Sequence, residues 1–258
     1  MRPRVTLLRG ARVLVTRPEP EDVGLGALLV AAGAEPIRIP VISLTPLLGP
    51  AEMQQLRTEV REGRYDIVAF TSANAVRLLA IERPVGSETE LFAIGPGTAA
   101  AARRLGWTPR PLPQEYLAES LAEVMVASGV RGRRVLLPRA EGAREVLPRV
   151  LEGAGARVTG VALYRAAADR ASAPGLRQLL LEAPPDWVTF TSSSSVRGYA
   201  ELAQGRGLPP GSRVACIGPV TAKTAESLSL GPDVVARVHS LPGLVAAMEA
   251  APVNDNTR

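Results

Sequence analysis

The sequence predicts an α/β protein made of two domains, each with an open, doubly wound parallel sheet. A chain of 258 residues is too long for one small core and suits two compact domains. The chain also contains an internal repeat, and within each copy short apolar runs alternate with longer helical patterns. This alternation is typical of parallel sheets whose strands are joined by helices.

The repeat consists of three blocks that occur twice in the same order. The matching pairs are residues 12–39 with 134–161 (10 identities in 28, offset 122), the segment from Asp66 with that from Asp186 (8 in 15, offset 120), and the segment from Phe92 with that from Ala215 (7 in 15, offset 123). A nearly constant offset indicates a duplication in which short loop insertions account for the small drift.

The strands are predicted where apolar residues follow one another without alternation, because a strand of a parallel sheet is buried on both faces. In chain order they are Val13–Thr16, Ile67–Phe70, Phe92–Ile94, Val135–Leu137, Val188–Phe190 and Val214–Ile217. The helices predicted between them are Leu25–Ala32, Ala73–Ala80, Thr98–Leu105, Tyr116–Ala127 and Thr221–Leu228.

Two stretches are interpreted as linkers, and both lie inside the copies rather than between them. Pro40–Pro50 contains three prolines and no clear period, and Ala166–Pro174 is rich in alanine and charge before a proline. Linkers at equivalent points inside both copies imply that the copies exchange halves. The predicted domains are residues 1–40 with 174–258, and residues 50–162, with linkers 41–49 and 163–173.

The composition favours a small anionic ligand over other partners. Net charge is +5, and 29 of the 30 cationic residues are arginine, whose planar fork binds carboxylate or phosphate. Nucleic acid is disfavoured because aromatic residues are only 3% of the chain and the densest basic cluster is Arg131, Arg133 and Arg134. One cysteine, Cys216, and one histidine, His239, leave too few ligands for a disulfide framework or a metal site.

The sequence also predicts a cytoplasmic protein without a membrane segment. No apolar run approaches the roughly 20 residues needed to span a bilayer. Arg9 interrupts the short apolar stretch near the start, which argues against a signal peptide.

The candidate site lies where loops leave the carboxyl ends of the strands, because ligands of open parallel sheets bind there. FTSANAV and FTSSSSV, and IGPGTA and IGPVTA, each end a strand and begin a helix. Their candidate binding residues are Thr71, Ser72, Asn74, Gly95, Gly97, Thr98, Thr191, Ser192, Ser193, Ser194, Gly218 and Thr221, and Arg17, Arg139, Arg165 and Tyr164 lie near further strand ends. Helix capping explains the hydroxyl residues equally well. Gly95, Gly97 and Ala100 also match a dinucleotide fingerprint, although Val220 breaks it in the second copy.

The succession of motifs resembles the uroporphyrinogen III synthase family. The residues that carry the resemblance are RVLVTRP, DIVAFTSANAV, AIGPGTA, LPRAEGAREVLPRVLEGAGARVTGVALYR, VTFTSSSSV and CIGPVTA, in that order. The resemblance implies two flavodoxin-like domains of discontinuous sequence joined by a two-stranded linker. It also implies a monomeric, cofactor-free hydro-lyase of heme biosynthesis that closes hydroxymethylbilane into uroporphyrinogen III, with inversion of the fourth ring and loss of water.

The resemblance further implies roles for the candidate residues. The linear tetrapyrrole carries eight carboxylates, which the backbone N–H groups and hydroxyls of the strand-end loops would bind, and Tyr164 would hydrogen-bond the departing hydroxyl. Two alternatives of other classes are a two-lobed sensor of small anions and a nucleotide-binding α/β protein.

Overall fold

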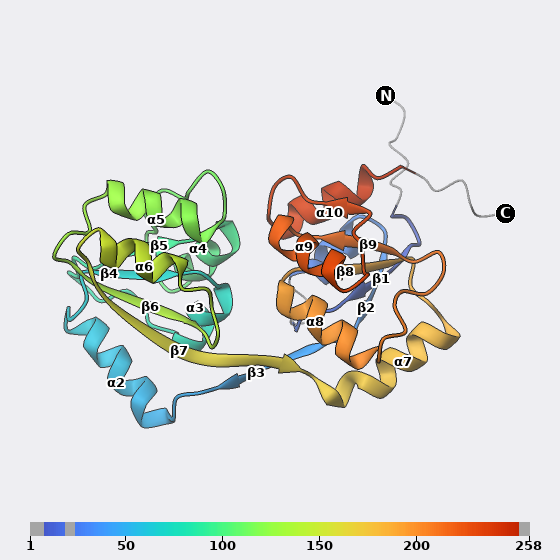
Figure 1. The fold of residues 1–258 in the computed structure, drawn as a ribbon, viewed down its shortest axis with the longest axis horizontal. Helices are drawn as coiled ribbons and strands as arrows, with labels where there is room; N and C mark the ends of the chain where they lie inside the picture. The colour runs from blue at the N-terminus through green and yellow to red at the C-terminus, as the bar shows by residue number, and fades with distance from the viewer. Residues whose placement is uncertain (1–7, 19–23, 253–258) are drawn as a thin grey trace. The chain divides into compact units, whose positions relative to one another are not determined.

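The computed structural model describes residues 8–18 and 24–252, which form two compact units (Figure 1). Unit 1 contains residues 1–43 and 167–258, and unit 2 contains residues 44–166. Residues 1–7, which belong to the start used to argue against a signal peptide, lie outside the described part of the chain. Within that described part, no helix is both long and apolar enough to cross a lipid bilayer.

Unit 1 has a five-stranded sheet in the order β10-β9-β8-β1-β2, and its paired strands run parallel. Counted from β2, this is the 2-1-3-4-5 order of flavodoxin-like folds. The strands are β1 (Arg12–Val15), β2 (Glu35–Arg38), β8 (Trp187–Phe190), β9 (Arg213–Cys216) and β10 (Val234–Val235).

Helices cover both faces of the unit 1 sheet. Alternate strand residues face opposite ways, so Leu14 packs with one core and Val13 and Val15 with the other. The first core takes α7 (Ala173–Glu182), α8 (Ser193–Leu202) and α9 (Pro219–Ser227), and the second takes α1 (Leu25–Ala31) and α10 (Leu241–Glu249). A 3-10 turn, Arg170–Ser172, precedes α7.

Unit 2 has the strand order β3-β7-β6-β4-β5, in which β7-β6-β4-β5 correspond to β2-β1-β8-β9 of unit 1 and the fifth strand, β3, lies at the other edge of the sheet from the place of β10. Its strands are β3 (Ile42–Pro46), β4 (Ile67–Phe70), β5 (Glu90–Ala93), β6 (Arg134–Ala140) and β7 (Arg157–Ala168). One face packs against α2 (Pro50–Arg61), α3 (Ala73–Leu79) and α4 (Pro96–Arg103), and the other against α5 (Ala118–Ala127) and α6 (Val146–Gly153). Each sheet is therefore doubly wound, as the sequence predicts.

Each sheet combines strands from both copies of the repeat. β1 of the first copy pairs with β8 of the second, and β6 of the second copy pairs with β4 of the first. All six predicted strands and all five predicted helices are confirmed, with ends displaced by a few residues.

The residues expected to be linkers contain strands. Residues 42–46 form β3, and residues 163–168 are the end of the long strand β7, which β3 neighbours in the unit 2 sheet. The boundaries between the units, after Ser43 and after Ala166, fall within these two strands. These strands agree with the two-stranded linker that the family resemblance implies, and the prolines of this region lie at the ends of elements. Pro46 closes β3 and Pro50 begins α2.

A glycine permits the close packing of α8 against the start of β3. A Cβ atom at Gly198 would lie 2.5 Å from the carbonyl oxygen of Val41 and 2.8 Å from Cγ2 of Ile42. Any larger residue would push the helix away from the backbone at 41–42, so Gly198 is needed despite its low helix propensity.

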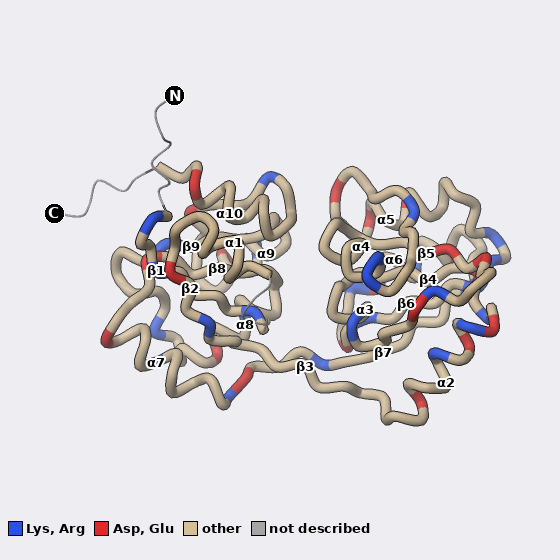
Figure 2. The backbone as a smooth tube through the Cα atoms, turned by 180° about the vertical axis from the view of Figure 1, so that it is seen from behind, with Lys and Arg blue, Asp and Glu red and all other residues tan. Residues whose placement is uncertain are grey.

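Basic and acidic residues are interspersed along the backbone of both units (Figure 2). Many of them pair locally, for example Arg165 with Glu141 and Arg144 with Glu119. Because many arginines are neutralised by a neighbouring carboxylate, an anion site depends on the local arrangement of groups as well as on the net charge of +5.

Candidate functional site

The predicted site residues lie at the carboxyl ends of the parallel strands in each unit. In unit 2, Thr71 and Ser72 follow β4, Gly95 follows β5, and Arg139 and Tyr164 lie in β6 and β7. In unit 1, Arg17 follows β1, Thr191 follows β8, and Gly218 follows β9. The same edge of each sheet therefore gathers residues that are far apart in the sequence.

Tyr164 and Ser72 are in direct contact in unit 2. β7 pairs with β6 through a register shift after Arg139, which places Tyr164 opposite Ala140 near the end of β6. The Tyr164 hydroxyl donates to Ser72 Oγ at 3.0 Å. Ser72 is also the N-cap of α3, because the same Oγ accepts the backbone N–H of Asn74 at 3.1 Å. Tyr164, Ser72 and Asn74 are thus held as one group.

The environment of Tyr164 has opposing effects on its phenol. Only 4% of the residue is exposed, and its ring belongs to the apolar core of unit 2. Burial raises the pKa of Tyr164, because a phenolate is poorly solvated there, while hydrogen bonds with the Ser72 and Asn74 side chains lower it. The phenol therefore stays protonated at neutral pH and can act as a hydrogen-bond donor.

A cavity of about 200 Å³ lies at the same edge of unit 2. Thr71, Ile94 and Pro138 line it from the strand ends, and its wall includes the guanidinium groups of Arg139 and Arg144, each of which is paired with a glutamate. Its remaining lining includes apolar residues of α5 and α6, such as Ala118 and Leu147. The cavity thus combines an apolar floor with cationic groups, a combination that suits an organic anion.

Arg139 is only partly satisfied within the protein. Its Nη2 donates to Glu145 Oε1 at 2.7 Å, but its buried Nη1 has no hydrogen-bond partner among the described residues. The side chain is 21% exposed, so water reaches only part of the guanidinium. A buried N–H without a hydrogen-bond partner costs free energy.

The serine run of unit 1 is more occupied than the sequence suggests. Ser192 caps α8 by accepting the backbone N–H of Ser195 at 3.1 Å, and Ser195 Oγ donates back to the Ser192 carbonyl at 2.7 Å. Ser193 Oγ accepts a hydrogen bond from Thr224 at 2.8 Å. The hydroxyls of Ser192, Ser193 and Ser195 are thus engaged in hydrogen bonds within the protein, and Ser194 is half-buried in the first turn.

The glycine loops after β5 and β9 have the same construction. Gly95 and Gly218 are the N-caps of α4 and α9, and a proline follows each. A Cβ at Gly95 would lie 3.1 Å from the Tyr116 ring, and one at Gly218 would lie 3.1 Å from the His239 ring. Each ring comes 21 residues after its glycine. The sequence analysis did not place Tyr116 and His239 beside the glycine loops, although this equal spacing in the two copies could have indicated it.

The remaining predicted residues fall into two groups by exposure. Thr98 and Thr221 are 6% and 5% exposed in the first turns of α4 and α9, so their side chains are largely withdrawn from solvent. Gly97 is exposed with open space around its Cα, and Arg17 is half-buried after β1. Gly95 and Gly218 are buried as well, so Gly97 is the only exposed one of the predicted residues in these two loops.

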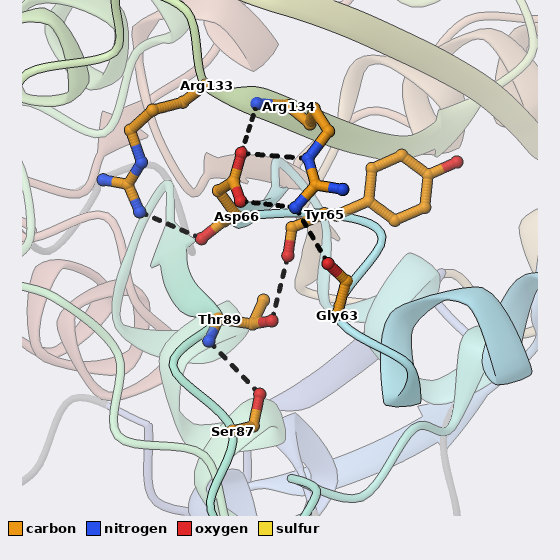
Figure 3. Close-up of polar contacts among 7 residues, drawn as sticks. All are labelled: Gly63, Tyr65, Asp66, Ser87, Thr89, Arg133 and Arg134. Carbon is orange, nitrogen blue, oxygen red and sulfur yellow. Dashed lines mark hydrogen bonds and ion pairs between the residues drawn. The ribbon is translucent and has the colours of Figure 1, made fainter.

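A second cavity, of about 600 Å³, lies at the opposite edge of the unit 2 sheet. Figure 3 shows Asp66, just before β4, facing Arg134 at the start of β6. Asp66 accepts from the backbone N–H of Arg134 and from its guanidinium, both at 2.7 Å, and these bonds lower the pKa of Asp66 from 3.8 to about 2. Arg133 donates to the Asp66 carbonyl and pairs with Glu90. Because these groups satisfy one another's hydrogen bonds, we interpret the cluster of Asp66, Arg133, Arg134 and Glu90 as a structural clasp that joins the starts of β4, β5 and β6.

Comparisons with known proteins agree on one family. The family model described as uroporphyrinogen-III synthase HemD matches residues 24–246. The putative uroporphyrinogen-III synthase of Methanothermobacter thermautotrophicus is 31% identical over 225 residues, which are 82% of this chain and 87% of that protein. The uroporphyrinogen-III synthase of Synechococcus elongatus is 30% identical over 255 residues, 94% and 96% of the two chains.

A solved structure gives the same result for the fold. A crystal structure of a mutant uroporphyrinogen III synthase from the extremely thermophilic bacterium Thermus thermophilus superposes with a TM-score of 0.60 at 19% identity. The match covers 93% of this chain and 98% of that chain. At this identity the likeness concerns the two-domain α/β fold alone.

Proposed function

Because the chain belongs to the uroporphyrinogen-III synthase family, an enzyme family of tetrapyrrole biosynthesis, we propose that its strand-end loops bind hydroxymethylbilane and direct its closure to uroporphyrinogen III. The protein is a ring-closing enzyme that acts on a tetrapyrrole, and hydroxymethylbilane is the linear form that such an enzyme cyclises.

The observation that carries the proposal is the partly satisfied Arg139. Its buried Nη1 lacks a partner among the described residues, and its side chain lines the cavity at the carboxyl edge of unit 2. One carboxylate arm of the substrate would complete the hydrogen bonding of this guanidinium with a charge-assisted bond. The other arms would be bound by N–H groups at the starts of helices, which carry positive partial charge.

The chemical step is supplied mainly by the substrate. Electrons of the terminal pyrrole expel the hydroxyl of the hydroxymethyl group, which leaves as water after gaining a proton, and an azafulvene cation remains. The substituted carbon of the fourth ring attacks this cation to give a spiro intermediate, and rearrangement inverts that ring. The enzyme holds the chain in the geometry for this attack, which can lower a barrier by roughly 7–11 kcal/mol without a strong acid or base.

Tyr164 is proposed to act at the departure of the hydroxyl. Its phenol lies at the strand-end edge, in contact with the helix cap formed by Ser72. A hydrogen bond from this phenol to the leaving oxygen is worth most when negative charge develops there, so it stabilises the transition state more than the bound substrate.

The product assay tests this function. Hydroxymethylbilane is incubated with the protein without added metal or nucleotide, and the oxidised product is separated by chromatography. We expect the III isomer, whereas the same mixture without protein closes to the I isomer. If only the I isomer is found above the control without protein, the proposed function is wrong.

The proposal extends to the state of the enzyme. We propose a cytoplasmic monomer that needs no cofactor, because positioning and the substrate's own electrons suffice for the reaction. Light scattering during size-exclusion chromatography should give the mass of one 27.1 kDa chain. A thermal shift caused by a nucleotide would instead favour the nucleotide-binding alternative.

A further inference from the structure

The two copies of the repeat differ at one position of the candidate site. At the offset of 122, Tyr164 corresponds to Ile42, and at the offset of 120, Ser72 corresponds to Ser192. Both serines cap the helix that follows their strand, α3 in unit 2 and α8 in unit 1. Only the unit 2 cap has a tyrosine at the corresponding place.

The fold itself does not require the tyrosine hydroxyl. Ile42 is 6% exposed and packs in the apolar core of unit 1, so an aliphatic side chain satisfies the same position of the repeat. Ser192 caps α8 with help from Ser195 and without a phenol. A buried phenol must find a hydrogen-bond partner, so the isoleucine is the simpler structural solution.

We propose that Ser72 is a positioning residue that orients the Tyr164 hydroxyl for the departing hydroxyl of the substrate. This inference rests on the proposed function, which gives Tyr164 its role. Tyr164 Oη and Ser72 Oγ are 3.0 Å apart, although the two residues are 92 positions apart in the chain. Ser72 Oγ is itself fixed by the backbone N–H of Asn74.

The contact can reverse its direction when substrate binds. A hydroxyl has one hydrogen and two acceptor sites, and its hydrogen rotates to suit its partners. Without substrate, Tyr164 donates to Ser72. With substrate, Ser72 keeps accepting from Asn74 N–H and donates its own hydrogen to Tyr164 Oη, which frees the phenol hydrogen for the leaving oxygen. No bond other than hydrogen bonds changes at Ser72.

The reversed arrangement strengthens the donor. A hydrogen bond donated to Tyr164 Oη stabilises negative charge on that oxygen, consistent with the effect of Ser72 in lowering the pKa of Tyr164. A series of hydrogen bonds therefore runs from the Asn74 N–H through Ser72 and Tyr164 to the substrate. Within the protein, both donor–acceptor pairs are at hydrogen-bond distance.

The test is a double-mutant cycle on formation of the III isomer. Ser72→Gly removes the hydroxyl at a cap position where glycine costs only a few tenths of a kcal/mol, so the variant folds. We expect Ser72→Gly to lower kcat about 3- to 10-fold, the worth of one hydrogen bond, with KM nearly unchanged. Ser72→Thr, which keeps the hydroxyl, should restore most of the kcat. In a Tyr164→Phe background, Ser72→Gly should have no further effect.

The matched control is the corresponding cap of unit 1. Ser192→Gly removes the equivalent hydroxyl in unit 1, where Ile42 takes the place of the tyrosine. Any change that it causes in kcat should therefore be the same factor in the parent and in the Tyr164→Phe background.

Three results would overturn the inference. The first is an unchanged kcat for Ser72→Gly while Tyr164→Phe is slow. The second is an equal loss from Ser72→Gly in both backgrounds. The third is parent turnover for Tyr164→Phe, which would remove the role of Tyr164 as well. Absence of any III isomer from the parent would instead refute the proposed function.

Discussion

Asp66 is predicted to stabilise unit 2 through its bonds to the start of β6. Its carboxylate accepts the backbone N–H and the guanidinium of Arg134, so it joins β4 of the first copy to β6 of the second (Figure 3). Asp66→Asn keeps the shape and one acceptor oxygen but removes the negative charge. The perturbation therefore isolates the charge of the clasp from its packing.

The magnitude follows from the pKa of Asp66. A fall from 3.8 to about 2 would correspond to about 2.4 kcal/mol at roughly 1.36 kcal/mol per pKa unit. The carboxylate is 33% exposed and Arg134 is 46% exposed, so solvent screening reduces this to about 1 kcal/mol. We expect Asp66→Asn to lower the Tm by about 2–4 °C at pH 7.

The pH dependence gives a second test of the same bonds. A carboxyl whose pKa is lowered on folding contributes stability above the unfolded pKa of 3.8 and loses it as pH falls towards about 2. The difference in Tm between parent and Asp66→Asn should therefore be constant above about pH 5, shrink between about pH 4 and 2, and vanish below that.

Asp186 provides the matched control in unit 1. Its carboxylate also accepts the backbone N–H of the first strand, from Arg12 at 2.7 Å, but the Arg12 guanidinium donates to the carbonyls of Ala183 and Pro184 instead. Asp186→Asn should cost less than Asp66→Asn at pH 7. Equal losses for the two variants, or a difference from the parent that persists at pH 2, would refute the reasoning.

Three further predictions concern the site, the packing and the units. Tyr164→Phe should lower kcat on the order of 10- to 1000-fold with little change in KM, and equal turnover at saturating substrate would reduce Tyr164 to a packing residue. Gly198→Ala should lower the free energy of unfolding, measured in urea, by about 1–3 kcal/mol, because the new Cβ would collide with the backbone of Val41. Gly175→Ala in α7, where the space is open, should raise that free energy by about 0.5–1 kcal/mol. The reverse order of the two variants would contradict the packing argument. Residues 44–166 expressed alone should fold and show near-ultraviolet dichroism from the buried Trp107, and a molten fragment would count against an independent unit.

The sequence located the central strands because their burial on both faces leaves a continuous apolar run. Ile67–Phe70 and Val188–Phe190 are fully buried, and the repeat marks both. β3 escaped notice for the opposite reason. It is one of the two edge strands of its sheet, and its residues range from buried to exposed. It also ends at Pro46, so neither an apolar run nor a regular alternation identifies it.

The site was predictable as a set of loops but not as a set of contacts. Topology alone brings the ends of parallel strands to one edge, so the position of Ser72 and Arg139 followed from the strand assignment. The contact of Tyr164 with Ser72 depends on the register shift after Arg139, which no local pattern encodes. The partial satisfaction of Arg139 by Glu145 likewise depends on where α6 begins.

The duplication has a consequence for how a linear substrate could be oriented. Both units have an arginine near the end of the corresponding strand, Arg17 at β1 and Arg139 at β6, and a serine cap on the helix that follows the neighbouring strand. Equivalent edges alone would bind similar carboxylate arms equally well and would not favour the hydroxymethyl group at either unit. Under the proposed function, Tyr164 breaks this equivalence, because Ile42 at the same position of the repeat has no hydroxyl. The proposal therefore places the departure of the hydroxyl at the unit 2 edge, where Tyr164 lies.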